Sequence, residues 1–221
     1  MNYIVIPAYQ PDNKLIKLIE KIHEKSDFHI LVIDDGSSSE CQKIFDKAKQ
    51  FATVIRHQVN QGKGQALKTA FTYIQEQNIY GTVVTADADG QHKVWDIFRT
   101  ANKASENPNK LILGVRAFSG KVPLRSRFGN SLTKALFKLQ TGVGVTDTQT
   151  GLRAFTTNLI PFMLKIEGQR YEYEMNMLLE ATKEYEILEV PIETVYINDN
   201  EASHFRPIQD GLMIYKNIFK F

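Results

Sequence analysis

The chain has 221 residues, of which 43% are hydrophobic and 24% charged, as expected of a globular protein with one large domain. Its formal net charge is only +2 and no block of lysine or arginine stands out, which argues against nucleic acid as a partner. The single cysteine, Cys41, excludes an internal disulfide. No run approaches the roughly 18 apolar residues of a membrane span, and the first residues show no basic and apolar leader. We therefore expect a cytoplasmic chain that does not cross a membrane.

The first half of the chain alternates between short β-branched runs and segments in which apolar residues recur at helical spacing. Strands are predicted at residues 3–6, 29–33, 53–56, 80–86 and 110–115. Pro7 is expected to end the first of them. The helices predicted between the strands have inner faces that run from Leu15 to Ile22, Cys41 to Ala48, Ala66 to Ile74 and Val94 to Ala101. This alternation predicts an α/β fold with a mostly parallel central sheet and helices on both faces.

The regular alternation stops after Val115. The elements predicted beyond it are a helix at 128–139, a strand at 151–155, a helix at 171–183, strands at 185–190 and 192–196, and a helix at 208–221. Pro191 is expected to separate the last two strands, since proline interrupts the hydrogen-bonded ladder of a sheet. No linker and no internal repeat is apparent, so we expect a single domain over residues 1–221.

Two carboxylates, Asp87 and Asp89, follow the predicted strand that ends at Ala86. Residues i and i+2 of an extended chain point the same way, so both side chains can bind one cation. Mg²⁺ and Mn²⁺ are typically bound by one or two carboxylates together with substrate phosphates. Taken alone, such a pair is more often a solvated turn.

Two other polar turns, at residues 7–9 and 34–37, also follow predicted strands. In open α/β sheets, ligands bind outside the carboxyl ends of the strands. These turns and the one at residues 87–91 should therefore line one crevice. Their convergence is the argument for a binding site.

Gly62, Lys63 and Gly64 open a predicted helix, where the lysine is suited to a diphosphate or to the edge of a base; a plain capping turn is the alternative. Two known nucleotide motifs are excluded. Leu67 occupies the small position of the dinucleotide fingerprint, and His57 stands where a P-loop requires glycine.

Four turns of the first half have a recognisable order and spacing. They read Ile-Pro-Ala-Tyr at 6–9, Val-Ile-Asp-Asp-Gly-Ser at 32–37, Asn-Gln-Gly-Lys-Gly at 60–64 and Asp-Ala-Asp-Gly-Gln-His at 87–92. This set resembles family 2 glycosyltransferases with a GT-A fold. The segments at 114–116, 147–155, 171–175 and 189–192 are similar to the dolichyl- and polyprenyl-phosphate sugar transferase branch. The resemblance covers nearly the whole chain.

What the resemblance implies is inverting transfer of a sugar from a nucleotide-sugar, with UDP-sugars favoured, to a polyprenyl phosphate such as undecaprenyl phosphate. By this likeness, the donor-binding residues are Pro7, Ala8, Tyr9, Asp35, Lys63, Asp87, Ala88 and Asp89. The expected metal, Mg²⁺ or Mn²⁺, is bound by Asp87, Asp89 and Gln91. Such a cation stabilises the negative charge that grows on the leaving nucleoside diphosphate.

A phosphate acceptor is already ionised near neutral pH, so it needs cations more than a strong base. The residues expected to hold it are Arg116, Arg127, Ser131 and Arg206, although each arginine is also compatible with an exposed salt bridge. Arg127 and Ser131 are four residues apart and share one helix face.

Catalysis is assigned by the same likeness to Asp89, Arg127 and Asp147, of which Asp147 positions the acceptor or orders its loop. Glu172 is a possible base if the acceptor is a hydroxyl, and Arg153 is expected to pin its loop.

The resemblance divides the domain into a nucleotide-sugar-binding half, residues 1–115, and an acceptor-binding half, residues 116–221. It also implies a peripheral location at the inner face of the cell membrane, with the membrane surface and a small membrane flippase-like protein as partners. The helix at 208–221 either packs on the domain or lies on the bilayer.

Two other functions stay open from sequence. One is a family 2 transferase that glycosylates a sugar hydroxyl in cell-surface polysaccharide or teichoic-acid synthesis. The other is a nucleotide-sugar-binding module without turnover. A nucleotidyltransferase is disfavoured because its glycine-rich N-terminal loop is missing here.

Overall fold

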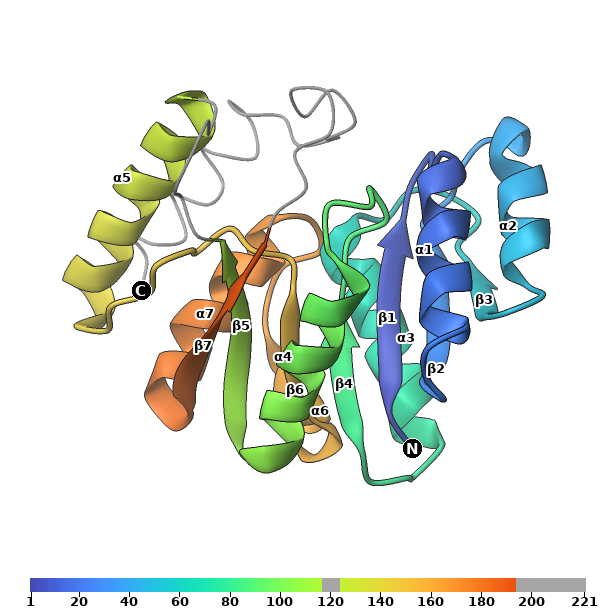
Figure 1. Cartoon of the computed structure of the whole chain (residues 1–221). Helices are drawn as coiled ribbons and strands as arrows, with labels where there is room; N and C mark the ends of the chain where they lie inside the picture. The colour runs from blue at the N-terminus through green and yellow to red at the C-terminus, as the bar shows by residue number, and fades with distance from the viewer. Residues whose placement is uncertain (117–123, 194–221) are drawn as a thin grey trace.

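The computed structural model describes residues 1–116 and 124–193, and for residues 124–132 it describes the helix backbone without the side chains. Within these ranges the strands form one seven-stranded sheet, in the order β3-β2-β1-β4-β6-β5-β7 (Figure 1). The strands are β1 (Tyr3–Ala8), β2 (His29–Asp34), β3 (Thr53–Arg56), β4 (Thr82–Thr85), β5 (Lys110–Arg116), β6 (Arg153–Thr156) and β7 (Glu186–Ile192).

Most of the strand pairs are parallel, as the alternation of strands and helices predicts. β1 pairs in parallel with β2 and with β4, β2 with β3, and β5 with β7. β6 is the exception, because it lies antiparallel between β4 and β5. The sheet is therefore continuous only because a strand from late in the chain fills the space between two earlier ones.

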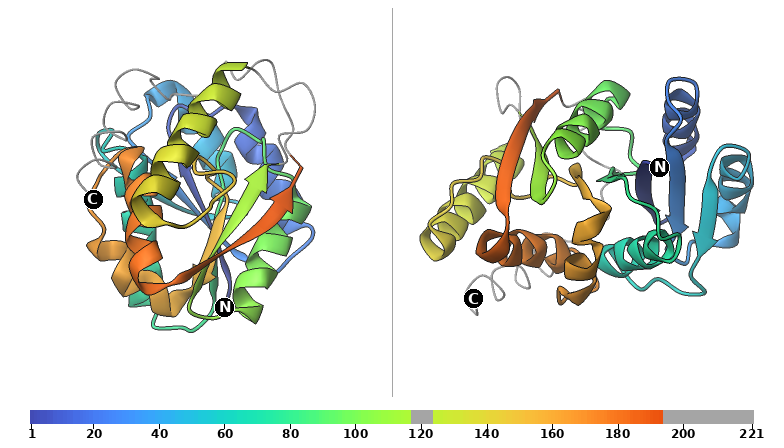
Figure 2. Two further views of the ribbon diagram at one scale, coloured as in Figure 1. Left: turned by 90° about the vertical axis from the view of Figure 1, so that its left-hand side faces the viewer. Right: turned by 90° about the horizontal axis from the view of Figure 1, so that it is seen from below.

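Helices cover both faces of the sheet. They are α1 (Asn13–His23), α2 (Gln42–Ala48), α3 (Lys63–Glu76), α4 (Val94–Glu106), α5 (Leu124–Thr141), α6 (Ile160–Lys165) and α7 (Glu172–Glu184), with 3₁₀ turns η1 (Ser39–Cys41) and η2 (Thr157–Leu159). Seen from below, α1, α2 and α4 lie on one side of the strands and α3, α6 and α7 on the other (Figure 2).

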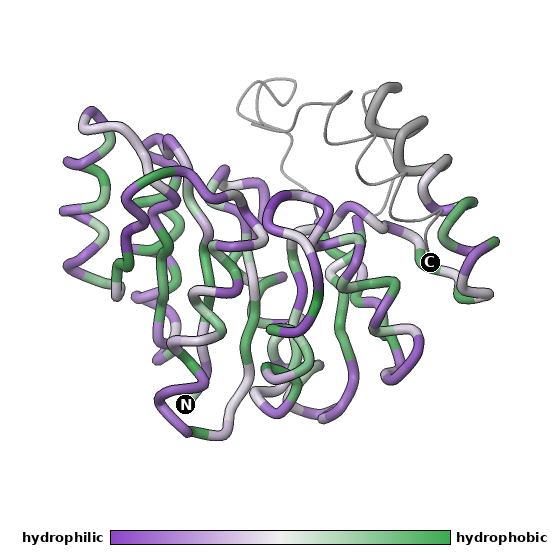
Figure 3. Tube along the Cα trace, turned by 180° about the vertical axis from the view of Figure 1, so that it is seen from behind, coloured by the Kyte–Doolittle hydropathy of each residue, from purple (hydrophilic) through white to green (hydrophobic). Residues whose placement is uncertain are grey.

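Successive side chains of a strand point to opposite faces of the sheet, so the core is divided into two clusters, one on each face. In β1, Tyr3 and Val5 pack into the cluster under α3, α6 and α7, whereas Ile4 and Ile6 pack into the cluster under α1, α2 and α4. Both faces of the central strands are thus buried, and hydrophobic residues dominate them (Figure 3).

Both proline expectations are wrong. β1 continues through Pro7 to Ala8, and β7 runs through Pro191 to Ile192. In β7 the reason is its position: among the described strands it pairs only with β5 and forms the edge of the sheet, where proline's missing N–H costs no ladder bond. The sequence reading also missed η2 and α6. The remaining predicted strand residues, 194–196, and the predicted helix at 208–221 lie outside the described residues.

Candidate functional site

The three polar turns of the first half meet at the carboxyl edge of the sheet. The amide of Asp35 donates to the carbonyl of Ala8 (2.9 Å), and the amide of Gln10 donates to Ser37 Oγ (2.9 Å). The amide of Ala86, at the end of β4, donates to the carbonyl of Val5 (3.0 Å). Parallel pairing of β1 with β2 and β4 therefore gathers these turns, as the strand-end argument predicts.

The predicted donor residues of the first turn differ in exposure. Ala8 is buried in the β1 ladder, Pro7 is half-buried, and Tyr9 is exposed at the start of the loop. Gln10 has a left-handed backbone (φ +50°), which is uncommon for a residue with a side chain. Its side-chain oxygen accepts a bond from Ser38 Oγ (2.9 Å), so the strained turn is held against the start of η1.

Asp35 organises the loop that leads to α3. Its buried carboxylate accepts hydrogen bonds from His57 Nδ1 (2.8 Å), Asn60 Nδ2 (2.9 Å), and the amides of Gln61 (2.9 Å) and Gly62 (2.8 Å). Both oxygens are therefore already engaged by the chain itself. The sequence predicts that Asp35 contacts the nucleoside, but it indicates no role for His57. His57 acquires its role through the contact with Asp35, which only the fold creates.

Lys63 and Asp87 form a partly buried ion pair, with 17% and 30% of their side chains exposed. Lys63 Nζ lies 2.7 Å from Asp87 Oδ1 and 2.9 Å from Glu174 Oε2, and His92 Nε2 lies 3.3 Å from Asp87 Oδ2. Burial opposes the ionised form of each partner. The opposite charges prevail, so the pKa of Lys63 is raised by Asp87 and Glu174, and the pKa of Asp87 is lowered by Lys63 and His92.

The pKa of Asp89 is shifted in the opposite direction from that of Asp87. Burial and then the charge of Asp87 raise its pKa, and its Oδ1 accepts a bond from the amide of Gln91 (2.9 Å). Among the residues that the structure describes, no lysine, arginine or histidine forms a salt bridge with Asp89. Ala88, between the two carboxylates, is half-buried. Within the described part of the chain, this turn thus holds one carboxylate that forms salt bridges, Asp87, and one that forms none, Asp89.

The chemistry of this turn fits Mg²⁺ or Mn²⁺, which prefer oxygen ligands and keep positions for substrate phosphates. The described residues contain no group of three or more His, Cys, Asp or Glu side chains arranged to hold a metal by themselves. Asp89, with Asp87 beside it, would hold the ion together with the oxygens of a ligand.

The loop before β6 packs directly on Asp87. A Cβ added to Gly151 would lie 2.3 Å from Asp87 Oδ2, and the hydroxyl of Thr85 donates to the carbonyl of Gly151 (2.8 Å). Arg153 is fully buried; its Nε donates to the carbonyl of Thr150 (3.0 Å), and its Nη1 donates to the carbonyl of Glu174. These bonds confirm that Arg153 pins the loop.

Arg116 and Asp147 bind one another. Arg116 Nε and Nη2 donate to the two oxygens of Asp147 at 2.6 and 3.0 Å, and Asp147 is completely buried. The amide of Gln149 also donates to Asp147 (3.1 Å), so of its two suggested roles the structure shows the ordering of the loop. Glu172 has a structural partner too, because its Oε1 accepts bonds from the amides of Gln169 (3.0 Å) and Arg170 (3.1 Å).

The other predicted acceptor residues fall where side chains are not described. Arg127 and Ser131 belong to α5, in a part of the helix where the structure describes the backbone alone. Arg206 lies outside the described residues.

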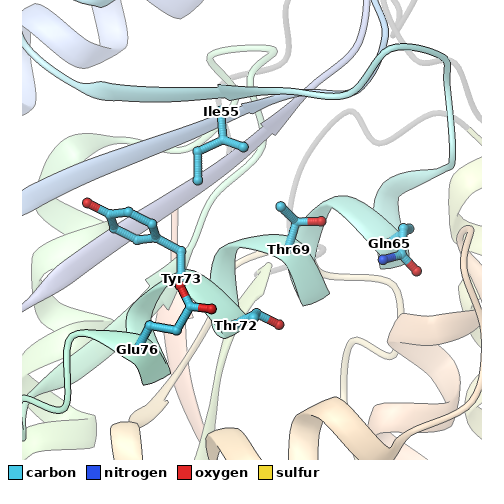
Figure 4. Close-up of a pocket in the computed structure, with 6 residues that line it drawn as sticks. All are labelled: Ile55, Gln65, Thr69, Thr72, Tyr73 and Glu76. Carbon is cyan, nitrogen blue, oxygen red and sulfur yellow. The ribbon is translucent and has the colours of Figure 1, made fainter.

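A cavity of about 290 Å³ lies between β3 and α3, and its lining includes none of the predicted site residues (Figure 4). Its lining residues are Ile55, Gln65, Thr69, Thr72, Tyr73 and Glu76. Thr69 Oγ1 lies 2.9 Å from His57 Nε2, so the wall of this cavity contacts the histidine that supports Asp35.

A mostly parallel sheet whose carboxyl edge carries polar turns and a glycine-flanked lysine is typical of an α/β protein that binds its ligand at that edge. Residues 3–163 match the family model for glycosyl transferase family 2, and the chain belongs to that family. Within the described residues, no helix combines the length and the apolar character that crossing a bilayer requires.

The curated relatives include sugar transferases named for lipid phosphates. The UDP-N-acetylglucosamine–dolichyl-phosphate N-acetylglucosaminyltransferase of Methanococcus voltae is 28% identical, over 88% of this chain and 85% of the relative. The polyprenol monophosphomannose synthase of Mycolicibacterium smegmatis is 23% identical, over 86% and 75%. These likenesses support the branch that the sequence motifs suggest.

Solved structures show the same fold. Glucosyl-3-phosphoglycerate synthase from Mycobacterium tuberculosis, crystallised with Mn²⁺, UDP and phosphoglyceric acid, has a TM-score of 0.72 at 16% identity, and the match covers 99% of this chain and 76% of that one. Mannosyl-3-phosphoglycerate synthase from Rubrobacter xylanophilus also has a TM-score of 0.72, at 15% identity, over 100% and 73%. The predicted α/β class and nucleotide-sugar transferase fold are confirmed.

Proposed function

We propose that this protein is an inverting, metal-dependent glycosyltransferase that moves a sugar from a nucleotide-sugar, preferably a UDP-sugar, to a polyprenyl phosphate. The observation that carries the proposal is the turn at Asp87 and Asp89, placed at the carboxyl edge of the sheet in a family 2 chain. The relatives named for dolichyl and polyprenyl phosphates support the class of acceptor.

In this reaction an oxygen of the acceptor phosphate attacks the anomeric carbon, and the bond from that carbon to the nucleoside diphosphate breaks. The chain's own residues position the donor: Tyr9 and the loop organised by Asp35 flank the nucleoside, while Lys63 keeps Asp87 in place beside Asp89. Mg²⁺ or Mn²⁺ at Asp89 and Asp87, with Gln91 as a third ligand, would supply Lewis-acid stabilisation of the leaving diphosphate.

We assign the acceptor phosphate to the second half. Arg116 is held in one orientation by its two bonds to Asp147, which prepares its guanidinium for a phosphate at low entropic cost. Arg127, Ser131 and Arg206 complete the proposed acceptor site, with Arg127 acting in catalysis. Work at the inner face of the cell membrane, beside a small membrane flippase-like protein, belongs to the same proposal.

The test is a transfer assay with purified protein, undecaprenyl phosphate in detergent, Mn²⁺ or Mg²⁺, and radiolabelled UDP- and GDP-sugars offered singly. We expect label in the organic phase with a UDP-sugar, and its loss with EDTA or with Asp89→Asn. Asp46→Asn is the matched control, because Asp46 is an exposed carboxylate on α2 that pairs with Lys49 (2.9 Å).

Transfer only to a sugar hydroxyl would refute the lipid-phosphate acceptor. It would favour a transferase of cell-surface polysaccharide or teichoic-acid synthesis. Metal-dependent UDP binding without transfer or hydrolysis would instead favour the non-catalytic module.

A further inference from the structure

The ammonium group of Lys63 forms salt bridges with a residue of each half of the chain, Asp87 and Glu174. Lys63 is the first residue of α3, Asp87 follows β4, and Glu174 lies in the first turn of α7. Only 17% of the Lys63 side chain and 12% of the Glu174 side chain are exposed, so solvent screens this contact weakly.

The surroundings hold Glu174 in this place. The backbone carbonyl of Glu174 accepts a bond from the buried Arg153, and a Cβ on Gly64 would lie 2.5 Å from Cβ of Tyr173, so α3 and α7 approach closely here. The sequence reading gave Glu174 no role, and neither the metal-binding turn nor the proposed acceptor site includes it.

The balance of charge makes Glu174 more than a packing residue. Without it, Lys63 would pair with Asp87 alone, and Asp89 would be the one carboxylate of the turn without a salt bridge to the described residues. With it, one ammonium is shared between two carboxylates, so the turn keeps a larger negative potential. Charges a few ångströms apart in a partly buried site interact strongly, and a divalent ion feels twice the interaction of a monovalent one.

We propose that Glu174 is a positioning residue for the reaction: by sharing the ammonium of Lys63 with Asp87, it fixes Asp87 and sets the affinity of the Asp87–Asp89 turn for a divalent cation. This inference rests on the proposed function for its metal. It adds a residue of the second half to the control of the donor site.

The test measures Mn²⁺ binding in the presence of UDP, from the loss of the free-ion EPR signal, without any turnover. Glu174→Gln keeps an oxygen that can accept from Lys63 but removes the charge, and we expect Mn²⁺ affinity to fall about tenfold. Glu180→Gln is the matched control on the same helix, since Glu180 is an exposed carboxylate paired with Lys183 (3.1 Å), and it should bind Mn²⁺ like the native protein.

A double-mutant cycle separates charge from structure. Lys63→Met removes the ammonium, and Lys63→Met combined with Glu174→Gln restores the native sum of charges. We expect the double variant to bind Mn²⁺ more tightly than Glu174→Gln alone, because the native sum of charges is restored, although Asp87 then lacks the ammonium that positions it. Thermal unfolding of each variant verifies that it is folded.

Native Mn²⁺ affinity in Glu174→Gln would overturn the proposal, and so would a double variant that binds more weakly than both single variants. If the native protein bound no Mn²⁺ with UDP, both this inference and the metal in the proposed function would fail. Normal Mn²⁺ binding without sugar transfer would refute the proposed function alone.

Discussion

Gly151 offers the sharpest test of how the site is assembled. In Gly151→Ala the new Cβ would lie 2.3 Å from Asp87 Oδ2, whereas ordinary contact begins at 3.4 Å. The carboxylate must therefore move by about 1 Å, away from a position fixed by Lys63 at 2.7 Å and by His92 at 3.3 Å. Misplacing a group at a reacting centre by this distance costs about 100-fold in rate.

We expect Gly151→Ala to lower kcat for sugar transfer by about 100-fold, with a loss of stability of about 1–3 kcal/mol from overpacking. The measurements are initial rates with saturating metal, and urea denaturation for the free energy of unfolding. Gly144→Ala is the matched control: Gly144 lies in the same loop, and nothing lies within 4 Å of an added Cβ there. A Gly151→Ala enzyme with kcat within about threefold of the native value would refute the argument that this contact positions Asp87.

Three further predictions concern charged groups of the site. Arg116→Met leaves the buried carboxylate of Asp147 without its guanidinium and should lower the free energy of unfolding in urea by about 3 kcal/mol. Adding Asp147→Asn should recover most of that loss, and additive losses would contradict the pairing. Asp35→Asn replaces one carboxylate oxygen with an NH₂ group, so two of the four hydrogen bonds that Asp35 accepts lose their acceptor; it should cost about 2 kcal/mol and weaken UDP binding in calorimetry, and unchanged UDP affinity would contradict its role. Burial raises and Lys63 lowers the pKa of Asp87, with a net decrease from its ordinary value of 3.8. Its ionised form therefore stabilises the fold above that value, and this contribution is lost as pH falls through the folded pKa. The stability difference between native protein and Asp87→Asn should shrink below about pH 4, and a constant difference would contradict the ion pair.

Local patterns were sufficient for the parts of the fold that depend on local chemistry. The apolar period of β1 and the helix after it, and the polar turns at Asp35 and Asp87, lie where periodicity and strand ends place them. Resemblance of the motifs predicted the family, and the family match confirms it.

What sequence reasoning missed depends on which distant segments meet. Pro191 is acceptable in β7 only because β7 is an edge strand, and edge position is a property of the whole sheet. Glu174 and His57 acquire their roles from partners on other elements, Lys63 and Asp35, and no spacing along the chain indicates either contact.

The position of β6 has a consequence for how the protein is made. β4 and β5 precede β6 in the chain, yet each pairs with β6 in the described sheet. A ribosome that has released only the first 116 residues has therefore produced β5 without either of its neighbours, because β7 comes later still. Contacts of such long sequence separation form late and slowly. The turns that we propose bind the donor, although encoded early, should reach their final geometry only when the rest of the sheet has emerged, and a truncated chain should expose apolar strand surface to chaperones.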